Sequence, residues 1–119
     1  MDHEHMHELS VMQGILEVVL RHAGKNGVSR VEAVNLQVGA LSHLREEWMQ
    51  KYFDHLTRDT LAEGAVLRVE RVPAVLVCRE CEAQFEWNGE GSPVCSACSS
   101  QRADLISGRE YTVASIEGA

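Results

Sequence analysis

The spacing of hydrophobic positions predicts helices and strands before any chemistry is considered. Between residues 8 and 24, apolar side chains recur three and four residues apart, as they do on one face of a helix. They are Leu9, Met12, Ile15, Leu16, Val19, Leu20 and Ala23. Gly24 and Gly27 stand where such a helix would end. This segment is therefore predicted to be an amphipathic helix.

Three later segments have the pattern of strands. Within 31–38 and again within 66–72, apolar and polar side chains alternate, as in strands with one buried face. The apolar members are Val34, Leu36, Val38, Leu67 and Val69. Residues 111–117 are predicted to form a third strand near the end of the chain.

A second helix is predicted between the first two strands. Ser42 is the last residue of a turn at 39–42 and is predicted to be the N-cap of this helix. Glu46 and Glu47 suit the positive end of the helix dipole. The helix is expected to run to about Thr57. The side chains expected to face inward are Trp48, Tyr52, Phe53 and Leu56.

All four cysteines fall in two Cys-x-x-Cys pairs, Cys78 with Cys81 and Cys95 with Cys98. Two such turns facing one another can place four thiolates at the corners of a tetrahedron, the geometry that Zn²⁺ adopts in structural sites. Iron or a redox-active disulfide are the alternatives, and the ribbon-like spacing favours zinc. Because four protein ligands leave no position for water, this zinc is predicted to be structural.

The cysteine pairs lie in a segment of their own. Pro73 marks its start, and a loop rich in turn formers at 88–93 lies at its centre. Because a predicted strand of the α/β domain follows the cysteine segment, this segment is predicted to be inserted into that domain and not appended to it. The predicted fold is α+β: a small three-stranded sheet with two helices, plus an inserted Cys₄ zinc-ribbon domain. Residues 1–73 and 109–119 would form the first domain and residues 74–108 the second.

Charge and composition exclude several functions. The 119 residues carry a net charge of −7, which disfavours nucleic acid as a partner, and Arg79 is the one base between Cys78 and Cys98. The sequence has no apolar run near ~18 residues and no secretory signal, so it predicts neither a membrane span nor export. Paired Cys-x-x-Cys motifs favour a reducing compartment, by default the cytoplasm. A glycine-rich phosphate loop, a spare cysteine and a spaced carboxylate pair are all missing, so no enzymatic activity is predicted.

The N-terminus is the second candidate metal site. His3, His5 and His7 alternate with acidic residues and a methionine, and imidazoles suit Ni²⁺, Cu²⁺ or Zn²⁺. The alternative is a flexible tail. A free amine, intervening amides and a nearby imidazole form a planar set of nitrogens that suits Ni²⁺, and His3 lies at a compatible distance from Met1. The scattered residues His22, His43 and His55 are predicted to lie at the surface.

Short segments in a fixed order carry a resemblance to a known family. They are Met-His-Glu-Leu-Ser at 6–10, Gly-Ala-Leu-Ser at 39–42, Gly-Ala-x-Leu at 64–67, the two cysteine pairs, and Ser-Ile-Glu at 115–117. From Met6 to its C-terminus the chain resembles the HypA/HybF family of nickel metallochaperones for [NiFe]-hydrogenase maturation.

The resemblance implies a nickel-binding α/β domain with a zinc domain inserted before the last strand. It also implies a GTPase partner, HypB, and a delivery target, the [NiFe]-hydrogenase large-subunit precursor. In the family, nickel is held by an N-terminal Met-His-Glu segment through the terminal amine, backbone amides and the imidazole. That segment matches Met6, His7 and Glu8, so His7 and Glu8 are the implied nickel-site residues.

Five residues precede Met6, which is a departure from the family pattern. Three interpretations follow: Met6 is the physiological start, His3 and His5 supply replacement ligands, or nickel binds at Met1-Asp2-His3. Two other functions remain open, a zinc-ribbon adaptor or nucleic-acid-binding module without nickel transfer and a thiol–disulfide oxidoreductase. The sequence also leaves open whether the protein is a monomer or a homodimer.

Overall fold

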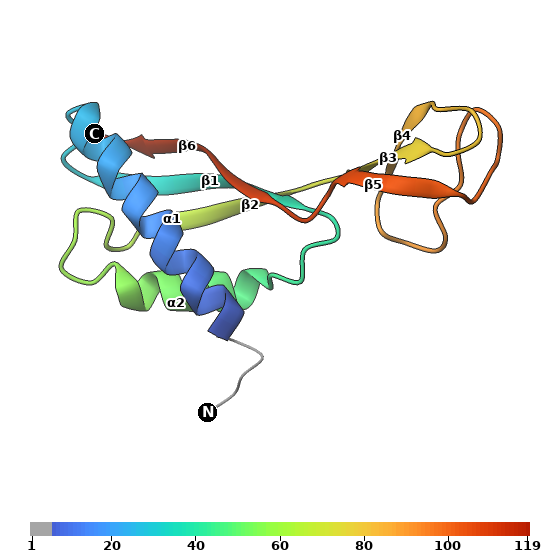
Figure 1. The fold of residues 1–119 in the computed structure, drawn as a ribbon. Coiled ribbons are helices and arrows are strands. Elements are labelled where there is room, and N and C mark those ends of the chain that lie inside the picture. The colour runs from blue at the N-terminus through green and yellow to red at the C-terminus, as the bar shows by residue number, and fades with distance from the viewer. Residues whose placement is uncertain (1–5) are drawn as a thin grey trace. The chain divides into compact units, whose positions relative to one another are not determined.

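The structure of the protein is a computed structural model that describes residues 6–119, with side chains from Glu8 onward. Its elements, in chain order, are α1 (Met6–Lys25), β1 (Val31–Gly39), α2 (Glu46–Leu56), β2 (Val66–Val72), β3 (Ala74–Cys78), β4 (Gln84–Trp87), β5 (Ala103–Ser107) and β6 (Tyr111–Gly118) (Figure 1). The first predicted helix and the three predicted strands are therefore confirmed. No helix in the described part of the chain is both long and apolar enough to cross a membrane.

The chain divides into two compact units. The first comprises Met1–Leu36, Leu44–Glu70 and Thr112–Ala119, and the second comprises Gln37–His43 and Arg71–Tyr111. Each unit has a three-stranded sheet at its centre, in the order β2-β1-β6 for one sheet and β4-β3-β5 for the other. The predicted α+β class, with two helices and a small three-stranded sheet, is confirmed.

The core of the first unit comes from the predicted apolar face of α1. Met12, Ile15 and Val19 are fully buried, because their spacing of three and four residues puts them on one side of the helix. α1 packs against α2, whose Met49 and Phe53 are also fully buried. Burying a side chain the size of phenylalanine contributes about 1.5–3 kcal/mol to the hydrophobic stabilisation of this unit.

The predicted start of α2 at Ser42 is wrong. The backbone amide of Ser42 donates to the carbonyl of Gly39 within a turn, and the N-cap of α2 is Arg45. Between them, Leu44 is only 2% exposed. The backbone at Arg45 is still extended, with φ −102° and ψ 125°, so the helix begins only after it.

The inward face predicted for α2 is correct only in part. Phe53 is buried as predicted, but the other fully buried side chain is that of Met49, and not those of Trp48 and Tyr52. These two aromatic side chains are half-buried, with ring centroids 5.9 Å apart and an interplanar angle of 33°. Met49 and Phe53 are four residues apart on one face of the helix, which leaves the flanking positions of Trp48 and Tyr52 at the boundary with solvent.

The last strand closes the first sheet. The amide of Gly39 donates to the carbonyl of Glu110, while Arg30 and Ala119 exchange backbone hydrogen bonds, so β6 runs antiparallel to β1. Across the strands, the side-chain amide of Asn35 bonds to Glu117, and Glu117 also forms an ion pair with Arg68 of β2. These polar side chains link all three strands on one face of the sheet.

The second unit has a small core centred on β3. Leu76 pairs with Phe85 of β4 and with Leu105 of β5, and both partner strands are antiparallel to β3. The buried members of this core are Ala74, Leu76, Cys78, Phe85 and Cys95. Two cysteines are thus part of the apolar core of the unit, which ties the metal-binding motif to its packing.

Two glycines, Gly39 and Gly108, allow two backbone segments of the second unit to approach closely. The amide of Leu41 donates to the carbonyl of Gly108 at 2.8 Å, which brings the end of β1 beside the turn between β5 and β6. A Cβ atom at Gly39 would lie 2.1 Å from the Gly108 oxygen, far inside contact distance. Gly108 itself has φ +145°, a value that side chains disfavour.

Candidate metal centre

Each Cys-x-x-Cys pair forms a tight turn, and the two turns repeat the same hydrogen bonds. In the first knuckle (residues 78–82), the amide of Glu82 donates to the carbonyl of Cys78 at 2.9 Å, and the amide of Glu80 donates to the Cys78 sulfur at 3.4 Å. The second knuckle (residues 95–99) makes both bonds around Cys95 at the same distances. Backbone dipoles therefore point at one sulfur of each knuckle.

The residue after each second cysteine has a left-handed backbone. Glu82 has φ 65° and Ser99 has φ 63°. This conformation costs an L-residue about 1–2 kcal/mol, so the turn geometry must compensate for it. These left-handed positions were not predicted, because the usual sequence signal is a glycine and neither position has one.

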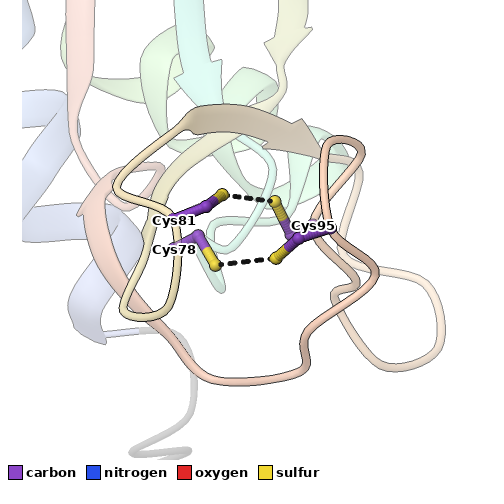
Figure 2. A group of neighbouring side chains, drawn as sticks. Cys78, Cys81 and Cys95 are labelled. Atoms are coloured by element: carbon purple, nitrogen blue, oxygen red, sulfur yellow. Dashed lines mark hydrogen bonds between the residues drawn. The ribbon is translucent and has the colours of Figure 1, made fainter.

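The two knuckles bring the four thiols together. The sulfurs of Cys78 and Cys98 are 3.5 Å apart, and those of Cys81 and Cys95 are 3.6 Å apart. All four sulfurs lie within 4.8 Å of one another. Figure 2 shows the sulfurs of Cys78, Cys81 and Cys95 pointing into the space between the knuckles.

The sulfur spacing fits a tetrahedral metal site. Zinc–sulfur bonds of about 2.3 Å in a tetrahedron place neighbouring sulfurs about 3.8 Å apart, close to the separations within the two sulfur pairs. A disulfide would need a sulfur–sulfur distance of about 2.05 Å, and all four cysteines are free. The donor set is therefore that of a thiolate-bound metal, and the four sequence-predicted ligands are indeed neighbours in space.

Within each close pair of sulfurs, the pKa of one thiol is lowered and that of the other is raised. The backbone amide of Cys81, together with that of Glu80, lowers the pKa of the Cys78 thiol to about 6. The Ser100 amide acts in the same direction on Cys98, but hydrogen bonding to Cys78 and desolvation raise the pKa of Cys98 to about 12. The pKa values of the two thiols in this close pair are therefore shifted in opposite directions.

The other close pair follows the same rule. The amides of Cys98 and Ala97 lower the pKa of Cys95. At Cys81, the Ala83 amide acts to lower the pKa, but hydrogen bonding to Cys95 and desolvation raise it above its ordinary value. Because a metal ligand must be a thiolate, a metal binding here displaces the protons that remain.

Ion pairs surround the knuckles. Both Arg79 Nε and Nη2 donate to Asp104, and this guanidinium lowers the pKa of that carboxyl. Arg102 pairs with Glu80 at 3.4 Å. Because the side chains of both pairs are more than half exposed, each pair contributes little stability. Their effect here is to neutralise the two arginines locally.

The nickel-site candidates fall partly outside the described residues. His3 and His5 lie outside them, and His7 is described only by its backbone, in the first turn of α1. Glu8 is described in full: it is 2% exposed, and its carboxylate accepts a hydrogen bond from the backbone amide of Arg45 at 3.3 Å. This contact was not predicted, because 37 positions in the sequence separate the two residues.

The remaining histidines are not grouped into a site. His22, His43 and His55 are all exposed, as their scattered positions predicted. In the described part of the chain, the four cysteines form the one group of three or more metal-binding side chains close enough to share an ion.

Comparison with known proteins gives a consistent result. Residues 6–118 match the family model described as "Hydrogenase/urease nickel incorporation, metallochaperone, hypA". The hydrogenase maturation factor HypA of Dehalococcoides mccartyi (strain ATCC BAA-2266 / KCTC 15142 / 195) is 34% identical over 94% of this chain and 93% of its own length. The hydrogenase maturation factor HybF of Klebsiella pneumoniae is 34% identical over 95% of this chain and 99% of its own.

The fold has a counterpart among solved structures. The solution structure of the nickel metallochaperone HypA from Helicobacter pylori superposes with a TM-score of 0.69 at 25% identity, covering 93% of this chain and 96% of that one. These relatives are named as maturation factors and metallochaperones rather than as enzymes. The chain belongs to the HypA family of nickel metallochaperones for hydrogenase maturation.

Proposed function

We propose that this member of the HypA family binds Ni²⁺ at its N-terminal segment and delivers it, with a HypB-type GTPase, to the [NiFe]-hydrogenase large-subunit precursor. The observation that carries the proposal is where the family match begins. It starts at residue 6, so it includes the Met-His-Glu segment at 6–8, and α1 begins at the same residue. The nickel site is then built on a helix start, with His7 and Glu8 as its residues and His3 and His5 as further candidates.

A helix start suits this chemistry. The first backbone amides of a helix have no carbonyl partner within it, so the amide nitrogens around His7 are not held by the helix ladder. Amide and imidazole nitrogens favour Ni²⁺ in a planar geometry, whereas four thiolates favour Zn²⁺. Two metals in one small protein are thereby separated by the type of donor atom.

We propose that Zn²⁺ is the structural metal of the second unit, bound by Cys78, Cys81, Cys95 and Cys98. The sulfur separations support a tetrahedral site. Two of the four ligands belong to the unit's buried core, so metal loss would also remove packing. On this proposal the zinc-binding domain spans residues 74–108. Reduced thiols suit the cytoplasm, which we propose as the location.

The zinc-ribbon adaptor or nucleic-acid-binding module is the alternative function. Its phosphate-binding form is disfavoured because Arg79 and Arg102 are both paired with carboxylates. A thiol–disulfide oxidoreductase is disfavoured by the sulfur separations, which suit a shared metal better than a bond between two sulfurs.

The test is a nickel titration of zinc-loaded protein, followed by calorimetry and by the absorption bands of planar Ni²⁺. The full chain is compared with a version that begins at Met6, and His7→Ala with His22→Ala, an exposed histidine on the same helix. We expect His7→Ala to lose nickel at unchanged zinc content and His22→Ala to bind as the parent does. Equal affinity in His7→Ala, or no nickel binding by either chain length, would contradict the proposal.

The chain-length comparison also identifies the donors. Tighter, planar binding only in the shorter chain would mean that the Met6 amine is a ligand and that residues 1–5 mask it. Equal or tighter binding in the full chain would mean that His3 or His5 has joined the site.

A further inference from the structure

Glu8 is a buried carboxylate in an unusual position. It lies in the first turn of α1 and is 2% exposed, although a buried carboxylate is costly unless it is well bonded. Its oxygen Oε2 accepts a hydrogen bond from the backbone amide of Arg45 at 3.3 Å. Arg45 is the N-cap residue of α2, so Glu8 contacts the start of a second helix.

The start of α2 has no local group for this role. The side chain of Arg45 makes no capping hydrogen bond, and its backbone is extended, with φ −102° and ψ 125°. In a capping box, a Glu or Gln three residues after the N-cap accepts a hydrogen bond from the N-cap amide. That position is occupied here by Trp48, which has no acceptor. Glu8 makes the missing bond from another helix.

Electrostatics favours the same arrangement. The positive end of a helix dipole stabilises a nearby carboxylate, and Glu8 lies in the first turn of its own helix while it bonds the N-cap of the next. Two helix starts therefore share one carboxylate. This explains why a glutamate can occupy a position that the helix pattern would give to an apolar side chain.

We propose that the Glu8 carboxylate is a positioning group that completes the capping box of α2 and so fixes the first turn of α1, where His7 lies. Its carboxylate is not a nickel donor, and the residue's contribution to the metal is confined to its backbone. The part of this inference that concerns nickel rests on the proposed function, whereas the capping part does not.

A donor role would conflict with the observed contact. To reach a metal outside the protein core, the carboxylate would have to leave the Arg45 amide unpaired and exchange a buried site for an exposed one. That conformation would lose both the hydrogen bond to the Arg45 amide and the burial of Glu8, so the fold opposes it. With the carboxylate retained at Arg45, nickel binds at a turn that is already ordered, which reduces the entropy cost of binding.

The experiment uses the zinc-loaded full chain and three variants, Glu8→Gln, Glu8→Ala and Glu17→Ala. Glutamine retains an acceptor oxygen but not the charge. Glu17 is an exposed glutamate on the same helix and serves as the control. Two readouts are taken: hydrogen exchange of the Arg45 amide by NMR without nickel, and nickel affinity by calorimetry.

We expect the Arg45 amide to exchange about tenfold faster or more in Glu8→Ala, since a bond to a charged acceptor is lost. Nickel affinity should fall about threefold to tenfold, which corresponds to a less ordered turn. Glu8→Gln should restore both within about threefold, because the amide bond is retained. Glu17→Ala should match the parent in both.

Three results would overturn the proposal. Unchanged Arg45 exchange in Glu8→Ala would refute the cap. Parental nickel affinity in Glu8→Ala, with fast Arg45 exchange, would refute positioning. Loss of nickel in Glu8→Gln as complete as in His7→Ala, with Arg45 still protected, would make the carboxylate a donor. Failure of the proposed function is distinct, because the parent itself would then bind no nickel while Arg45 exchange would still test the cap.

Discussion

Replacing Gly39 with alanine should destabilise the second unit by about 3 kcal/mol or more. The added Cβ would lie 2.1 Å from the oxygen and 2.2 Å from the carbonyl carbon of Gly108, both backbone atoms. Relief requires the two segments to separate by about 1 Å or more to reach ordinary contact. Such a shift stretches the Leu41 amide bond to Gly108 and the Gly39 amide bond to Glu110, which are now 2.8 and 2.9 Å.

The magnitude combines two effects of similar size. Forcing an extra methyl into a packed site costs about 1–3 kcal/mol, and each weakened backbone hydrogen bond costs about 1 kcal/mol. The control is Gly14→Ala, because a Cβ there meets nothing within 4 Å and the residue is in the middle of α1. Helix propensity alone predicts that Gly14→Ala stabilises its unit by about 1 kcal/mol.

The assay follows urea unfolding of zinc-loaded protein by tryptophan fluorescence. The chain has two tryptophans, and Trp87 packs against the core of the second unit, so a Trp48→Phe background isolates the unit in question. A Trp87→Phe background isolates α2 for the Gly14 control. If Gly39→Ala unfolds within about 0.5 kcal/mol of the parent, the close contact between the two glycines does not constrain the fold.

Three further predictions concern the metal and the first core. Cys78→Ser should lose zinc and the amide protection of residues 74–108, while the helical circular dichroism of α1 and α2 persists. The control Ser96→Ala, at an exposed position in the second knuckle, should keep its zinc and its amide protection. A Cys78→Ser protein that retains zinc and melts like the parent would refute a structural site. Zinc affinity, measured by chelator competition, should fall as the pH is lowered from about 8, because Cys98, whose pKa is raised to about 12, must lose a proton to bind zinc. The affinity should fall more steeply below about pH 6, where Cys78 also becomes protonated. An affinity that does not change with pH would contradict these thiol pKa values. Phe53→Ala should destabilise the first unit by about 3–5 kcal/mol in urea unfolding followed by Trp48 fluorescence, since Phe53 is fully buried, and a loss below about 1 kcal/mol would mean that the site collapses without a cavity.

Periodic features of this fold were predictable and non-local ones were not. The helix α1 could be predicted because its buried face repeats along its whole length, as at Met12, Ile15 and Val19. The four-sulfur cluster could be predicted from the cysteine spacing, because each knuckle is formed by residues that are close together in the sequence. The strands β3, β4 and β5 have only four or five residues each, too few for alternation to be recognised.

The start of α2 shows where local inference fails. Ser42 has the right chemistry for an N-cap, and nothing nearby in the sequence marks Arg45 as the better one. In the structure Leu44 is buried, and the Arg45 amide donates to a carboxylate 37 residues away. Neither can be read from a window of sequence around residue 45. The nickel residues His3, His5 and His7 remain predictions that rest on the sequence and on family membership.

The strand order β2-β1-β6 has a consequence for how the protein is made. β1 is the central strand of its sheet, yet its partner β6 leaves the ribosome last, after the whole cysteine segment. Until then, one edge of β1 has unpaired amides and carbonyls, and α1 and α2 can pack only on a two-stranded ribbon, which is marginal by itself. The helix α1 is thus synthesised first but belongs to a unit that is finished last. The sheet of the first unit therefore cannot be completed before all four cysteines of the second unit have been translated.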